Sequence, residues 1–120
     1  MPSPEFQLIE RFFKSDIHRP DVRIGIGDDA AVLRTPKNAE LIWSVDSLIS
    51  GVHFLPQHSA RSVGHKALAV NLSDMAAMGA EPSWISLALS MPEADTLWLE
   101  QFCRGFYDLA YRYQLELIGG

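Results

Sequence analysis

The chain has 120 residues, 48% of them hydrophobic and 21% charged, which predicts one globular domain with its own core and excludes a disordered chain. The formal net charge of −5 and the scattered basic residues argue against a nucleic-acid partner, although divalent cations would still let carboxylates bind a phosphorylated small molecule. The single cysteine allows no internal disulfide, and neither a signal peptide nor a membrane-length apolar run is visible. These features predict a soluble, cytoplasmic protein.

The first half of the chain predicts a helix, a turn and a strand, in that order. Residues 4–14 place apolar side chains at helical spacing, as a short amphipathic helix does. Residues 25–32, GIGDDAAV, are typical of a turn, because glycine and aspartate are common turn formers. Residues 40–49, ELIWSVDSLI, alternate as a strand does, with Ser44 and Asp46 on one face. Two polar side chains therefore share a face of a predicted strand.

The second half alternates helix and strand. Residues 59–79 predict a helix that ends at a glycine C-cap, and residues 84–90 predict a strand. A second helix begins at residue 95 or 96, and residues 115–118 form a last short strand before two glycines. The predicted core stripe of that helix comprises Leu99, Phe102, Cys103, Phe106, Leu109, Ala110 and Tyr113.

Three carboxylates stand out as possible metal ligands, namely Asp29, Asp46 and Asp74. Each alone is better explained as a turn residue, a solvated strand end or a solvated helix face. However, small and apolar residues surround Asp74, and Asp46 interrupts a strand that otherwise looks buried. Buried carboxylates are costly unless they are paired or bind metal, and few basic residues are nearby. Together they favour hard divalent cations as partners.

The remaining polar candidates are less specific. His53 follows the predicted strand and is explained equally well as a structural residue or as a ligand contact. Lys66 is typical of the first turns of a surface helix, and Cys103 falls in a core stripe, where it is not expected to be a nucleophile. No Walker, Rossmann, zinc or EF-hand motif is present.

Four segments in order, GIGDDAAVL, SVDSLISGVHF, HKALAVNLSDMAAMGA and ELIGG, closely resemble the N-terminal half of the thiamine-monophosphate kinase family. This family belongs to a superfamily of ATP-using enzymes related to aminoimidazole-ribonucleotide synthetase, which also includes selenophosphate synthetase. The resemblance implies transfer of the γ-phosphate of ATP to thiamine monophosphate, giving thiamine diphosphate, with several Mg²⁺ ions between carboxylates and phosphates. It therefore implies a phosphotransferase with ATP and thiamine monophosphate as its small-molecule partners.

The resemblance also assigns roles to single positions. Asp29, Asp46 and Asp74 match metal-binding carboxylates, and Ser44 matches a further metal contact. Val45 stands where a threonine hydroxyl is expected, which removes one ligand. Two further matches are His53, a substrate contact, and Gly120, a nucleotide contact.

The implied fold is α+β, with a mixed or antiparallel sheet that helices cover on one face and that pairs with the sheet of a second copy in a homodimer. Residues 1–120 then form the ATP- and metal-binding, dimerising N-terminal domain, and the family's C-terminal domain is absent from the sequence. Without that domain, the chain alone is expected to be inactive. The alternatives are another ATP-using enzyme of the superfamily, such as a selenophosphate-synthetase-like protein, and a non-catalytic nucleotide- or metal-binding dimerisation module.

Overall fold

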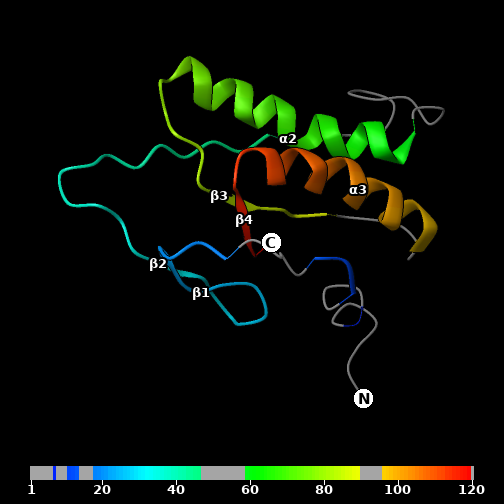
Figure 1. The fold of residues 1–120 in the computed structure, drawn as a ribbon, viewed down its shortest axis with the longest axis horizontal. Helices are drawn as coiled ribbons and strands as arrows, with labels where there is room; N and C mark the ends of the chain where they lie inside the picture. The colour runs from blue at the N-terminus through cyan, green and yellow to red at the C-terminus, as the bar shows by residue number, and fades with distance from the viewer. Residues whose placement is uncertain (1–6, 8–10, 14–17, 47–58, 90–95, 120) are drawn as a thin grey trace. The chain divides into compact units, whose positions relative to one another are not determined.

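The computed structural model describes residues 7, 11–13, 18–46, 59–89 and 96–119 (Figure 1). Within them the elements are β1 (Val22–Ile24), β2 (Val32–Leu33), α2 (Ala60–Ala77), β3 (Trp84–Ser86), α3 (Thr96–Arg112) and β4 (Glu116–Gly119). The mixture of helices and strands agrees with the helix and strand content of the expected α+β fold. The predicted helix over residues 4–14 lies mostly outside the described residues.

The chain divides into two compact units. One unit contains residues 1–41, 83–94 and 114–120 and carries the four strands of the described residues. The other contains residues 42–82 and 95–113 and carries α2 and α3.

Among the described residues, the strand-bearing unit contains two small sheets of two strands each. β1 and β2 pair antiparallel, with Val22 opposite Leu33, and residues 25–31 connect them. β3 and β4 pair in parallel, with Trp84 opposite Glu116. The stretch 40–46, predicted as a strand, has no regular secondary structure, and the remainder of that prediction lies outside the described residues. A strand needs a neighbouring backbone for its hydrogen bonds, and alternation alone does not supply one.

The helical unit is built on α2 and α3, which lie side by side (Figure 1). α2 begins where the Ser59 side chain accepts a hydrogen bond from the Ser62 N–H at 3.1 Å, an N-cap. Gly79 follows the helix with φ +68°, and the Ala80 N–H donates to the Met75 carbonyl at 2.9 Å, which closes the last turn. Both boundaries agree with the sequence prediction.

The core of the helical unit lies along one stripe of α3. Its buried residues are Leu99, Phe102, Cys103, Gly105, Phe106, Leu109 and Ala110. They face Val63, Gly64 and Leu68, the buried residues of α2. Tyr113 was expected in the same stripe but is half exposed, because α3 ends at Arg112. No helix in the described part of the chain is long and apolar enough to cross a membrane.

The two helices approach each other closely at a pair of glycines, Gly64 and Gly105. A Cβ atom built on Gly64 would lie 1.9 Å from the Phe102 carbonyl oxygen, and one on Gly105 would lie 1.9 Å from the Arg61 carbonyl oxygen. No side chain fits at these distances, so each helix packs its glycine directly against the backbone of the other. This contact fixes the spacing of α2 and α3.

Candidate functional site

Two of the predicted metal ligands lie together in the helical unit. Asp74 is on the last turns of α2, and Asp46 ends the irregular stretch 40–46. A hydrogen bond that the protonated Asp74 carboxyl donates to Asp46, and then the repulsion between the two like charges, raise the pKa of Asp74. The two carboxyl groups therefore lie close to each other.

The sequence argument for these two residues was partly wrong. It expected both carboxylates in buried surroundings, but both are exposed. The small and apolar residues around Asp74 in the sequence lie on other sides of the helix, where Leu72 and Met75 are half-buried. The raised pKa of Asp74 comes mainly from the neighbouring Asp46 carboxyl, and burial contributes least to it.

Ser44 is exposed two residues before Asp46, in the same stretch of chain. Asn71, one turn before Asp74, donates from its amide nitrogen to the Ala67 carbonyl at 3.0 Å. His53 and Gly120, the predicted substrate and nucleotide contacts, lie outside the described residues.

Asp29 belongs to the strand-bearing unit, in the turn segment of residues 25–31. Gly27 has φ +105°, a conformation that glycine adopts without strain, and the Asp29 N–H donates to the Asp28 carboxylate at 2.9 Å. Asp28 therefore braces the turn, and both side chains are exposed. This confirms the turn predicted from GIGDDAAV.

The donor chemistry fits a hard divalent cation. Paired carboxylates supply charge and oxygen ligands, and a cation between them would replace their repulsion by attraction. In the part of the chain that the structure describes, no group of three or more His, Cys, Asp or Glu side chains gathers as a metal centre. The convergence of Asp29 with Asp46 and Asp74 therefore stays a prediction.

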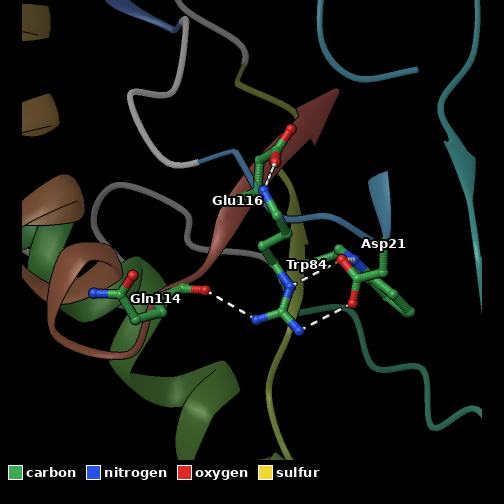
Figure 2. A network of polar contacts seen from close by, with 5 residues as sticks. Asp21, Trp84, Gln114 and Glu116 are labelled. Atoms are coloured by element: carbon green, nitrogen blue, oxygen red, sulfur yellow. Dashed lines mark hydrogen bonds and ion pairs between the residues drawn. The ribbon is translucent and has the colours of Figure 1, made fainter. Parts of the chain in front are cut away.

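A polar cluster in the strand-bearing unit was missed by the sequence analysis (Figure 2). The Arg19 N–H donates to Glu116 Oε1 at 2.6 Å, and its guanidinium donates to the Gln114 carbonyl at 3.0 Å and to both Asp21 carboxylate oxygens. Trp84 Nε1 donates to Asp21 Oδ1 at 3.0 Å. The hydrogen bond from the Arg19 guanidinium lowers the pKa of Asp21 by more than burial raises it, and the weaker effect of the Trp84 hydrogen bond lowers it further. The cluster fastens the segment before β1 to the β3–β4 pair.

Cys103 is the one cysteine and is buried in the core stripe of α3. Burial raises the pKa of its thiol to about 12, so the nucleophilic thiolate is essentially absent at neutral pH. This confirms that Cys103 packs in the core and is not placed as a nucleophile.

Comparison with known proteins identifies the family. Residues 27–120 match the family described as "AIR synthase related protein, N-terminal domain". The chain therefore belongs to the AIR synthase related proteins and carries their N-terminal domain.

Among individual proteins, the chain is similar to enzymes named thiamine-monophosphate kinase. It is 49% identical to the one from Escherichia coli K12 and 40% identical to the one from Bacillus subtilis, over 100% and 97% of its own length. A crystal structure of thiamine-monophosphate kinase from Stenotrophomonas maltophilia matches 99% of this chain with a TM-score of 0.83 and 49% identity. The chain spans 36–38% of the length of these relatives. The resemblance read from the sequence is confirmed.

Proposed function

We propose that this chain supplies the ATP- and magnesium-binding part of a thiamine-monophosphate kinase. The reaction breaks the bond between the β- and γ-phosphates of ATP and joins the γ-phosphoryl group to a phosphate oxygen of thiamine monophosphate. The products are ADP and thiamine diphosphate. The observation that carries the proposal is 49% identity to the Escherichia coli enzyme over the whole of this chain.

The exposed carboxylate pair supports the magnesium part of the proposal. Asp46 and Asp74 would hold Mg²⁺ together, with Asp29 and Ser44 as further contacts. Bound Mg²⁺ neutralises phosphate charge and offsets the charge that develops on the transferred group. Because Asp46 raises the pKa of Asp74, Asp74 would lose its proton as the cation enters, so metal affinity would increase as the pH rises.

Phosphoryl transfer does not require a covalent intermediate with a protein side chain. Positioning the acceptor in line and offsetting charge provide most of the rate. This fits a site whose polar side chains are carboxylates and a serine hydroxyl, beside a turn that contains glycine. The one cysteine, a potential nucleophile, is buried in the core away from solvent. His53 as a substrate contact and Gly120 as a nucleotide contact are part of the same proposal.

We also propose a homodimer that pairs through the stretch 40–46. Leu41, Trp43 and Val45 are 63%, 69% and 71% exposed, and they alternate along the chain as the side chains on one face of a strand do. Exposed apolar residues in a row are typical of surfaces that another chain covers. A second copy would supply the strand partner that the described residues of one copy do not give this stretch. The cytoplasmic location likewise stays a proposal.

A domain exchange tests the function. Residues 1–120 replace the corresponding segment of the Escherichia coli enzyme, and the hybrid is assayed for ADP and thiamine diphosphate with and without Mg²⁺. We expect equal amounts of both products, only with Mg²⁺. Asp74→Asn should abolish most of this activity, whereas Asp108→Asn, at an exposed ion pair with Arg61, should leave it unchanged.

Two outcomes would contradict the proposal. A folded hybrid that binds ATP with Mg²⁺ but transfers no phosphate would favour a non-catalytic binding module. Full activity in Asp74→Asn would remove the carboxylate pair from the mechanism.

A further inference from the structure

Glu116 is the one charged side chain that the described part of the chain buries, with 5% of its surface exposed. It begins β4, between Leu115 and Leu117, which are both buried. Placing a carboxylate in such surroundings costs free energy unless hydrogen bonds compensate for the lost water. Its position therefore calls for a reason beyond packing, because an apolar residue would fit a buried strand at lower cost.

The contacts of Glu116 lie at both ends of β1. On the near side, Oε1 accepts the Arg19 N–H at 2.6 Å, three residues before the strand begins. On the far side, Oε2 lies 2.9 Å from where a Cβ atom of Gly25 would be, one residue after the strand ends. One carboxylate thus borders the chain as it enters β1 and as it leaves.

Gly25 also opens the turn segment that carries Asp28 and Asp29 (residues 25–31). Any side chain at this position would meet the carboxylate, so the glycine allows the backbone to approach Glu116 closely. Trp84 on β3 lies opposite Glu116 on β4, and its Nε1–H donates to Asp21, just before β1 (Figure 2). Trp84 and Glu116, the first paired residues of β3 and β4, therefore both bind the segment of residues 19–25 that precedes this turn.

We propose that Glu116 is a positioning residue that sets the place of the turn segment, and through it the carboxylate of Asp29, for binding Mg²⁺ and phosphate. This inference rests on the proposed function. Glu116 acts through Arg19 and Gly25 and does not itself touch metal or substrate. The role needs a hydrogen-bond acceptor in Glu116 and does not need its negative charge, because its partner is a backbone N–H.

Two substitutions separate the acceptor from the charge. Glu116→Gln keeps a carbonyl oxygen for the Arg19 N–H, and Glu116→Leu removes it in a side chain of similar size. Glu100→Leu is the matched control, because it removes a partly exposed glutamate from an ion pair with Arg104 on α3. All three are made in the 120-residue chain and in the hybrid enzyme.

The first measurement is amide hydrogen exchange in the 120-residue chain. Three N–H groups report on the root of the hairpin: Arg19, which donates to Glu116; Val22, which donates to the Arg19 carbonyl; and Arg34, which donates to the Asp21 carbonyl. Glu116→Leu should speed their exchange roughly tenfold or more, the effect of losing one hydrogen bond to a charged group. Glu116→Gln and Glu100→Leu should stay within about threefold of the parent, less than the loss of one hydrogen bond.

The second measurement is the Mg²⁺ concentration for half-maximal activity of the hybrid. Glu116→Leu should raise it roughly tenfold, and Glu116→Gln should restore it close to the parent value. A purely structural role would lower the melting temperature and the active fraction but leave the half-saturating Mg²⁺ concentration unchanged.

An unchanged Mg²⁺ dependence in folded Glu116→Leu overturns the positioning role, even if its exchange is faster. Unchanged exchange overturns the anchoring itself. If the unsubstituted hybrid shows no Mg²⁺-dependent transfer, the proposed function fails and the positioning role fails with it. The exchange data then still decide whether Glu116 anchors the turn.

Discussion

Replacing Gly64 by alanine tests the close approach of α2 and α3. The new Cβ atom would lie 1.9 Å from the Phe102 carbonyl oxygen, roughly 1.5 Å short of the 3.4 Å at which ordinary contact begins. The Phe102 carbonyl oxygen belongs to the backbone of a helix, which cannot rotate away as a side chain can. The helices must therefore separate, and the contacts of Leu68 and Phe102 across the interface weaken with them.

The expected cost combines two opposing effects. Overpacking a well-filled interior costs about 1–3 kcal/mol, and the backbone contact places Gly64→Ala near the upper value. Alanine in place of glycine within a helix returns about 1 kcal/mol through its higher helix propensity. We expect a net loss of roughly 2 kcal/mol of unfolding free energy, which lowers the melting temperature of a domain of this size by about 5–10 °C.

Urea unfolding followed by far-UV circular dichroism measures this difference. Ala76→Gly is the matched control, because Ala76 is exposed on the same helix and the substitution replaces alanine by glycine instead of glycine by alanine. It should cost less than about 1 kcal/mol, because the full penalty of glycine applies to the helix interior and Ala76 lies in the last turn of α2. If Gly64→Ala proves as stable as the parent while Ala76→Gly shows its loss, the helices do not meet at this glycine.

Three further predictions concern the thiol, the carboxylate pair and the exposed stretch. Cys103 should resist alkylation from pH 7 to 9 and react only on unfolding, since its pKa is raised to about 12; rapid alkylation of the folded chain would contradict its burial. The pKa of Asp74 in the folded chain is raised above its ordinary value of 3.8. The free energy of unfolding of the metal-free chain should therefore fall as the pH rises from 3.8 through the raised pKa. Asp74→Asn should remove this fall, as should Mg²⁺. The measurement is the free energy of unfolding by urea at several pH values, with a chelator present for the metal-free protein. If this free energy depends on pH in Asp74→Asn as it does in the parent, the reasoning is wrong. Trp43→Ser should shift a dimer toward monomer in sedimentation with reductant present, and Leu97→Ser, at an equally exposed residue of α3, should not; dimers of undiminished strength in Trp43→Ser would refute pairing through this stretch.

The helices were predictable from sequence because their signals are local. Ser59 and Gly79 mark the ends of α2, and apolar spacing marks the buried stripe of α3. The β1–β2 hairpin was missed, because strands of three and two residues are too short to show alternation. The strand predicted over residues 84–90 shrinks to Trp84–Ser86 among the described residues for a related reason, since pairing with β4 sets its length.

The candidate site was predictable only in part. Their sequence surroundings and the family resemblance together selected Asp46 and Asp74, and the structure brings these two together, although the burial argued for them is absent. Glu116 could not be found by its pattern, because one glutamate between leucines is typical of any strand with an exposed face. Its burial depends on contacts with Arg19, a residue distant in the chain.

The hydrogen bond between Arg19 and Glu116 joins positions 97 residues apart, which has a consequence for the order of folding during synthesis. Ribosomes add about 5–20 residues per second, so the arginine waits roughly 5–20 s before its glutamate is made. Contacts at such long separation also carry a large loop-closure cost and form late. The segment that leads into the Gly25 turn is therefore released from the ribosome well before its anchor. A slow stretch of translation between these two positions would lengthen the time for which chaperones and proteases meet it unfastened.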